Sequence, residues 1–155
     1  MFLCIHLDDF KKENILINNK IRNNIITNSY FYRLYYSNNN FISNGIVLCF
    51  NLMDIQVEKY FNKNKLIFNK SLNSNIIKKI NKIELDLLSS LNIEKKEKKC
   101  LIGEQLINGY IKIINEYLEK TNKNVTLIIK ISGLWESKTD YGLTFRCMKA
   151  KKKYN

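Results

Sequence analysis

The chain has 155 residues, enough for one domain that buries its own core without disulfides or metal to stabilise it. Its formal charge of +12, from 26 basic against 14 acidic residues, favours polyanionic partners such as nucleic acid. The charge comes from 23 Lys and only three Arg, and Asn and Ile are as numerous as Lys. Because these residues share A/T-rich codons, a biased genome explains the Lys excess as well as selection for binding does.

The cysteines and the apolar runs exclude several further classes. No C-x-x-C pair is present and one histidine is available, so neither a metal site nor a cofactor is predicted. Cys49 and Cys147 lie inside apolar runs, as is typical of free thiols in a reducing compartment. Residues 1–10 carry acidic side chains too early for a signal peptide, and no run reaches about 20 apolar residues. We therefore expect an intracellular protein without a membrane partner.

Strand patterns dominate the first part of the chain. Residues 1–28 hold two short apolar runs, which indicate either an extra strand pair or a loosely attached N-terminal arm. The aromatic run at 29–37 predicts a strand, and an Asn-rich turn leads from it into a second strand at 45–52. We expect these two strands to form a hairpin. A third strand, or a second and shorter hairpin, is predicted from 55–61 and 66–68.

The pattern becomes helical in the middle of the chain. Apolar residues repeat every three or four positions across 75–91, which predicts an amphipathic helix. The charged segment 93–99 is predicted to be a solvated, disordered loop. The segment 101–120 fits either one helix or a short helix followed by a strand, and we favour a helix that breaks near Gly109.

Two strands close the chain. Apolar and polar residues alternate across 125–132 and again across 142–148, as expected of half-buried strands. The connection between them contains Gly133, which suits a β-bulge, and Asp140, which suits a turn. These two strands are predicted to form a C-terminal hairpin.

This order of elements predicts an α+β fold in a single domain, residues 1–155. Three strands, a helix and two closing strands match an OB-like five-stranded barrel, a fold whose sheet face and loops bind oligonucleotides. A curved antiparallel sheet, with the amphipathic helix 75–91 between its third and fourth strands, fits the same order. The last residues, 149–155, are predicted to be a basic tail.

No catalytic motif is present. The chain lacks phosphate-binding glycine loops and the nucleophile elbow of hydrolases, and it has only five glycines. His6 and Asp8 resemble a base and its orienting carboxylate, but no nucleophile can be linked to them. Asp8 and Asp9 are adjacent, so on a strand they point to opposite faces and make a poor metal clamp. We predict that the protein is not an enzyme.

The strand at 29–37 offers a binding surface instead. Its period of two places Phe31, Arg33 and Tyr35 on one face and the remaining aromatic residues on the other. Bases stack on aromatic rings while a guanidinium meets phosphate, so this row suits single-stranded nucleic acid. The alternative is that both faces are buried, with Arg33 at the rim.

The C-terminal hairpin contributes three more candidates. Lys130 and Arg146 fall opposite the most apolar rows of their strands, and Trp135 stands where the connection leaves the sheet. There Trp135 either stacks on a base or closes the end of the core. The lysines of the tail 149–155 either attract phosphate without specificity or serve only solubility.

The segment 130–146, KISGLWESKTDYGLTFR, resembles a K-[IV]-S-G-[IL]-W-E…Y-G-[LIV]-[TS]-[YF]-[KR] hairpin of small, poorly characterised proteins from large DNA viruses and related virus-like elements. The resemblance covers most of residues 30–148, although only the hairpin is specific. It implies a viral or virus-derived origin, which agrees with the biased composition. A hairpin motif this compact equally serves as a folding signature, so it carries no binding site by itself.

These observations together predict a non-catalytic, single-stranded nucleic-acid-binding protein that is virus-derived and replication-associated, with DNA favoured over RNA. The alternative is a protein-interaction or structural module, homo-oligomers included, that uses the exposed aromatic edge of the strand 29–37. A third possibility is a degenerate enzyme or processivity subunit. The residues predicted to line the nucleic-acid groove are Phe31, Arg33, Tyr35, Lys130, Trp135 and Arg146.

Overall fold

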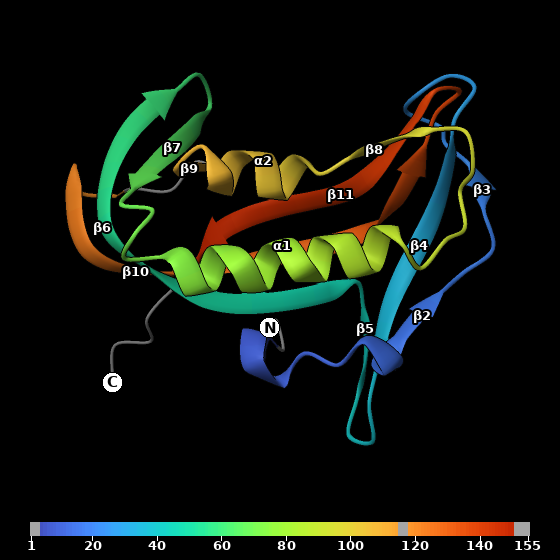
Figure 1. Ribbon diagram of the computed structural model, residues 1–155, viewed down its shortest axis with the longest axis horizontal. Coiled ribbons are helices and arrows are strands. Elements are labelled where there is room, and N and C mark those ends of the chain that lie inside the picture. Colours follow the sequence, from blue (N-terminus) through green and yellow to red (C-terminus); the bar gives the residue numbers. More distant parts are fainter. Residues whose placement is uncertain (1–3, 115–117, 151–155) are drawn as a thin grey trace.

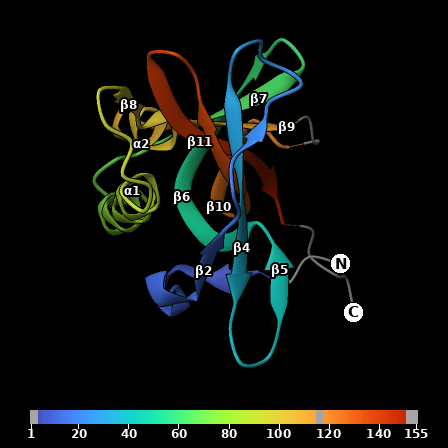
Figure 2. The ribbon, with the colours of Figure 1, turned by 90° about the vertical axis from the view of Figure 1, so that its right-hand side faces the viewer.

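The computed structural model describes residues 4–114 and 118–150, which form a mostly antiparallel sheet with two α-helices on one side of it (Figures 1 and 2). The predicted α+β class is confirmed. The OB-like five-stranded barrel is not confirmed, because the sheet is open and has 11 strands. The strands are β1 (Ile5–His6), β2 (Ile15–Ile17), β3 (Ile21–Arg22), β4 (Tyr30–Ser37), β5 (Ile42–Asn44), β6 (Ile46–Tyr60), β7 (Lys63–Phe68), β8 (Glu97–Lys99), β9 (Tyr110–Ile114), β10 (Thr121–Glu136) and β11 (Asp140–Lys149). The helices are α1 (Ser74–Leu88) and α2 (Leu101–Ile107).

Two long strands, β6 and β10, form the centre of the sheet. They pair antiparallel from Ile46 opposite Ile131 to Gln56 opposite Thr121. Alternate residues of a strand point to opposite faces, and on the helix side the section from Ile46 to Leu52, with its partners Val125 to Ile131, carries only apolar residues. The fully buried members of this row include Leu48, Phe50, Leu52, Leu127 and Ile129.

A bend in β6 joins the sheet to the first helix. Asp54 takes a left-handed conformation with φ 57°, and the side chain of Asn73 fills the place of a neighbouring strand beside it. The Met53 N–H donates to Asn73 Oδ1 at 2.9 Å, and Asn73 Nδ2 donates to the Met53 carbonyl, also at 2.9 Å. The segments 45–52 and 55–61, predicted as separate strands, are therefore one strand that bends here.

The N-terminal segment belongs to the sheet. β1 pairs in parallel with β6, while β2 and β3 pair antiparallel with β4. Both apolar runs of the segment 1–28 thus form extra strands, as one of the two expectations held, but they pair with β6 and β4 and not with each other. The predicted hairpin of 29–37 with 45–52 is also wrong, because β4 turns back into β5 and pairs with β10. Neighbours on both sides of β4 leave no free strand edge within its described length.

The predicted amphipathic helix is α1, whose apolar stripe packs on the sheet. Glu84 lies on the same buried side and reaches the start of α2. Its carboxylate accepts hydrogen bonds from the N–H groups of Ile102 at 3.0 Å and Gly103 at 2.6 Å. The first N–H groups of a helix have no partner within that helix, so Glu84 satisfies two of them and joins the helices.

Between α1 and β10 the structure confirms one prediction and corrects another. Gly109 follows α2 with φ 77° and the chain continues as β9, so the favoured break near Gly109 is confirmed. The segment 93–99 is not entirely a loop, because it contains β8, which pairs in parallel with the start of β11. Lys99 pairs with Glu97 of the same segment and with Asp140 of β11, and the local charge pattern does not show the second of these ion pairs.

β10 and β11 form the predicted C-terminal hairpin. A register shift confirms the bulge at Gly133. The strands extend further than predicted, so the connection is only 137–139 and Trp135 lies inside β10. The Asp140 N–H donates to Ser137 Oγ at 2.9 Å, which closes the turn. The expectation that Trp135 stands in the connection is therefore wrong.

Candidate nucleic-acid interface

The register of the sheet places the three candidates from β4 on one face with Trp135. Trp135 of β10 is directly opposite Phe31 of β4, and directly opposed residues project to the same side. Arg33 and Tyr35 follow Phe31 at the strand period of two, so they share this side. Leu34 points the other way and is completely buried. β4 therefore has a core face and an outward face, as its pattern predicts.

The two cations of the C-terminal hairpin lie on the same side. Lys130 of β10 is directly opposite Arg146 of β11. Thr144, two residues before Arg146, is opposite Gly133, and Gly133 is in turn opposite Arg33. The register thus extends one face across three strands. We call this surface the open face and define it by Phe31, Arg33, Tyr35, Lys130, Trp135 and Arg146.

Two of the three aromatic rings of the open face lie over glycines. A Cβ atom on Gly133 would come within 2.4 Å of Phe31 Cζ, and one on Gly142 within 2.8 Å of Trp135 Cζ2. Each ring therefore covers the backbone of the next strand, and only glycine leaves room for it. Both rings are half-buried, with one side packed on the sheet and the remainder in solvent. Rings held in this way suit the stacking of planar bases.

Three cations lie on the same side of the sheet as these rings. Arg33 is exposed, and its Nη1 donates to Asn44 Oδ1 at 3.4 Å. Arg146 is exposed and Lys130 is half-buried, so both reach the surface on this side of the sheet. Cations placed beside aromatic rings can meet the phosphates of a strand whose bases stack. Of the lysines in the predicted tail, Lys149 lies in β11. The remaining three lie outside the described residues: Lys151, Lys152 and Lys153.

On the core side, Glu136 of β10 connects the end of its strand to β4, so it joins the two strands that carry Phe31 and Trp135. Its carboxylate accepts hydrogen bonds from the Tyr32 hydroxyl at 2.6 Å and from Lys96 Nζ at 2.5 Å. Burial opposes ionisation, but these two hydrogen bonds outweigh it and hold the pKa of Glu136 below its usual value. Burial, and after it the bond to Glu136, raises the pKa of Tyr32 to about 12. A tyrosine with this pKa stays protonated near neutral pH. Its hydroxyl therefore serves as a hydrogen-bond donor that joins the strands of Phe31 and Trp135.

Two apolar members of this face are not evident in the sequence. Leu16 of β2 is opposite Tyr35, and Ile21 of β3 is opposite Phe31. Both side chains are more than half exposed. No local pattern identifies them, because it is their pairing with β4 that brings them to the open face. They extend the apolar surface next to the rings.

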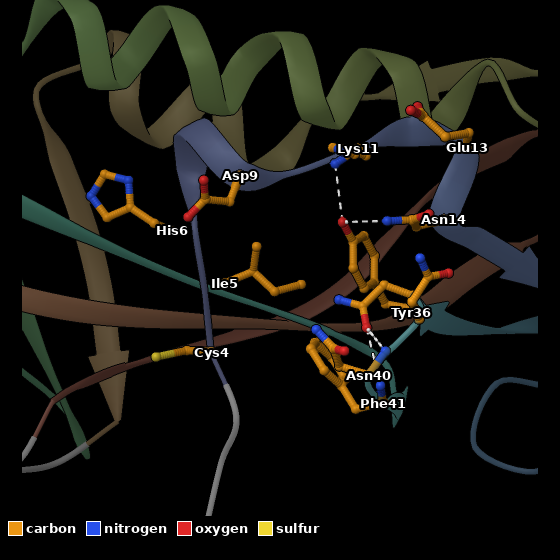
Figure 3. A pocket seen from close by; sticks show the side chains of 12 residues that line it. Cys4, Ile5, His6, Asp9, Lys11, Glu13, Asn14, Tyr36, Asn40 and Phe41 are labelled. Atoms are coloured by element: carbon orange, nitrogen blue, oxygen red, sulfur yellow. Dashed lines mark hydrogen bonds between the residues drawn. The ribbon is translucent and has the colours of Figure 1, made fainter.

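A separate cavity of about 440 Å³ lies between the N-terminal turns and the β4–β5 hairpin (Figure 3). The hydroxyl of Tyr36 accepts hydrogen bonds there from the Lys11 N–H at 3.1 Å and from Asn14 Nδ2 at 3.2 Å. The ring of Tyr36 stacks with Phe41. Side chains of both charges line the opening, and none of its lining residues belongs to the open face.

His6 and Asp8, the pair that resembles a base and its orienting carboxylate, are both exposed, and Asp8 forms an ion pair with Lys79. His6 Nδ1 lies 3.5 Å from Asp8 Oδ2, and Lys79 also contacts this carboxylate. The hydrogen bond from Lys79 holds the pKa of Asp8 below its usual value. Within residues 4–114 and 118–150, no three His, Cys, Asp or Glu side chains gather in a way that could hold a metal ion. No helix in the same part of the chain is long and apolar enough to cross a membrane.

Comparison with known proteins found no matching family model, no matching curated protein and no matching solved structure. The class of this protein is therefore defined by its fold and its surface alone. It is an α+β protein in which an open sheet face combines aromatic rings with cations.

Proposed function

We propose that this protein binds single-stranded nucleic acid, without catalysis, through the open face. The observation that carries the proposal is the direct pairing of Phe31 with Trp135, next to Arg33. The resemblance of segment 130–146 to viral proteins supports DNA over RNA and a replication-associated role. β9 and β11 lie close together, and hydrogen bonds between these two strands would be needed to close the sheet into an OB-like barrel. The proposed binding requires only the open face.

The open face supplies the two interactions that a single strand requires. Stacking of a base on an aromatic ring contributes about 1–3 kcal/mol per base and tolerates any sequence. Cations on the same surface contact phosphates and release counterions, which makes binding depend on salt. We therefore expect a preference for single strands over duplex, because only unpaired bases are free to stack on Phe31 and Trp135.

The test is a titration of labelled single-stranded DNA, single-stranded RNA and duplex of one sequence, followed by fluorescence anisotropy at about 50 and 200 mM salt. Trp135 is the only tryptophan, so its intrinsic emission reports directly on the open face. We expect single strands to bind more tightly than duplex, to remain bound at the higher salt, and to quench this emission. Weak binding, equal for all three ligands, that disappears at the higher salt with unchanged emission would overturn the proposal.

A pair of variants separates binding from folding. Phe31→Leu removes the stacking ring but keeps an apolar cover over Gly133, and we expect binding about tenfold weaker. Phe41→Leu is the matched control, because Phe41 is a half-buried aromatic residue in the loop between β4 and β5 and lies outside the open face. It should bind like the parent. An equal loss of affinity in both variants would show that the effect comes from folding and not from stacking.

A second candidate function is a protein-interaction module, favoured by the exposed Leu16 and Ile21 beside the rings. The predicted route through a free edge of β4 is not available, since β4 has neighbours on both sides. A protein partner, or a second copy of the chain, would instead cover the apolar part of the open face. Assembly that grows with protein concentration in sedimentation velocity, and that added oligonucleotide does not change, would favour this function.

A further inference from the structure

A second exposed surface with aromatic and basic residues lies at the tip of the β6–β7 hairpin. Phe61 is 92 % exposed and its neighbour Tyr60 is 43 % exposed. Their rings meet edge to face, with 5.0 Å between centroids. β9, the next strand, adds Lys112, which is opposite Lys65 of β7. We call this surface the hairpin patch and define it by Tyr60, Phe61, Lys63, Lys65 and Lys112.

Neither packing nor turn geometry explains a phenylalanine at position 61. Tyr60 pairs with Lys63, so Phe61 and Asn62 form a two-residue turn. Phe61 has φ 51°, a region that favours glycine and that costs a bulky residue about 1 kcal/mol or more. Its side chain buries almost none of its surface in return. A large ring kept in a strained and exposed position indicates a role in binding.

Two of the three lysines of the hairpin patch are held in place by aromatic rings. Lys112 Nζ lies 4.2 Å from the centroid of Tyr60, and Lys65 Nζ lies 4.7 Å from the centroid of Tyr110. Cation–π contacts of this kind restrict where the ammonium groups lie. Among the described residues that pair between β6, β7 and β9 and lie on the same side of the sheet as the three lysines, only Glu58 carries a carboxylate. The surface is therefore complementary to an anion that also carries planar groups.

We propose that the hairpin patch is a second contact for the single strand that binds the open face, an inference that rests on the proposed function. The tip of β6–β7 lies toward one end of the long axis of the molecule, and β3 with the start of β4 lies at the other (Figure 1). Both surfaces combine rings for bases with cations for phosphates, and both lie on strand faces that the core does not use. A single-stranded nucleic acid long enough to span the molecule contacts both surfaces.

This arrangement predicts a dependence of affinity on ligand length. A short oligonucleotide occupies the open face alone. A longer one places its free end near the hairpin patch at high effective concentration, so the second contact adds affinity without a second association step. Affinity then increases when the ligand becomes long enough to reach Phe61.

The test measures the affinity of oligonucleotides of roughly 6 and roughly 30 nucleotides for the parent, Phe61→Gly and Trp135→Leu proteins. Phe61→Gly removes the ring and suits the left-handed turn, so the fold is retained. We expect the parent to bind the long ligand at least about tenfold more tightly than the short one. Phe61→Gly should lose this gain and bind the short ligand like the parent. Leu72→Ala, at an exposed apolar residue outside both surfaces, should keep the gain.

The outcomes distinguish this inference from the function on which it rests. Trp135→Leu weakens the binding of both lengths if the open face is the primary site. Should the long ligand gain nothing, or should Phe61→Gly keep the gain, the second contact is overturned and the proposed function stands. If the parent binds neither length, both are overturned. Capture by phosphatidylserine vesicles that requires Phe61, without any gain from ligand length, would assign the patch to an anionic membrane and overturn the inference.

Discussion

The indole of Trp135 lies over Gly142, the residue directly opposite it on β11. A Cβ atom at Gly142 would lie 2.8 Å from Cζ2 and 3.0 Å from Cε2 of this ring. The ring shields the glycine backbone, and the glycine allows one side of the ring to rest on the sheet. Trp135 and Gly142 of the C-terminal hairpin thus have one physical reason for occurring together.

Gly142→Ala should therefore destabilise the protein by about 1–3 kcal/mol, because the added methyl group must displace the indole. Urea denaturation measures this loss, and a shift of the tryptophan emission reports the displacement. The same substitution in the Trp135→Leu background should cost less, since a smaller side chain can move aside. Equal losses in the two backgrounds would show that Trp135 does not depend on Gly142.

The guanidinium groups of the open face should control the salt dependence of binding. Arg33→Gln and Arg146→Gln should each reduce the slope of log affinity against log salt by about 1. Lys78→Gln and Lys82→Gln are matched controls with the same type of change, because these lysines are exposed on α1. Their slopes should equal that of the parent. Equal changes in all four variants would mean that total charge, and not the open face, attracts the ligand.

Glu84 should make the protein less stable as the pH rises. Burial raises the pKa of Glu84 above its ordinary 4.5, and hydrogen bonds from the Ile102 and Gly103 N–H groups offset only part of this. A raised pKa in the folded state contributes stability that is complete below 4.5 and is lost as the pH rises through the raised pKa. Glu84→Gln should remove this decline. Urea denaturation from about pH 4 to 8 measures it, and an unchanged decline would assign it to other groups.

Glu136 should act in the opposite direction. Its pKa is lowered by Lys96 and Tyr32 despite burial, so its stabilising effect is complete above 4.5 and is lost as the pH falls through the lowered pKa. Glu136→Gln should lower the free energy of unfolding at neutral pH by about 1–3 kcal/mol and weaken its dependence on acid. If the variant is as stable as the parent at neutral pH, the contacts of Glu136 do not hold these strand ends.

Asn73 should be among the most sensitive polar positions. Asn73→Ala removes both hydrogen bonds to the Met53 backbone where β6 bends, and leaves buried polar groups without partners. We expect a loss of about 2 kcal/mol in the free energy of unfolding. Asn75→Ala, at an exposed position near the start of α1, is the matched control and should change stability little. Similar losses at both positions would indicate an effect on the helix and not on the bend.

Patterns that depend on neighbouring residues were predictable from the sequence. Alternation across 29–37 and 125–132 identifies strands, and the longer period across 75–91 identifies α1, because burial of one side is a local property of each element. Gly109 marks a helix end for an equally local reason, since its φ of 77° is one that glycine adopts readily. Gly133 marks the bulge for another reason: a Cβ atom there would lie 2.3 Å from the carbonyl oxygen of Tyr32.

The errors concern strand partners, which local patterns do not determine. β4 pairs with β10 and not with the next long strand, and the hydrogen bond of Tyr32 with Glu136 joins residues 104 positions apart. β8 forms within a charged segment because β11 offers it a partner. In each case the pairing is selected by packing over the whole core, which outweighs the preference of a short segment.

The sequence by itself indicated which residues of 29–37 and 125–132 share a side of their strand, because side chains alternate along a strand. Only the tertiary structure decided that the outward sides of β4, β10 and β11 join into one surface, with Phe31 beside Trp135 and Lys130 beside Arg146. The physical reason is that the register between strands distant in the chain is set by the burial of their opposite sides.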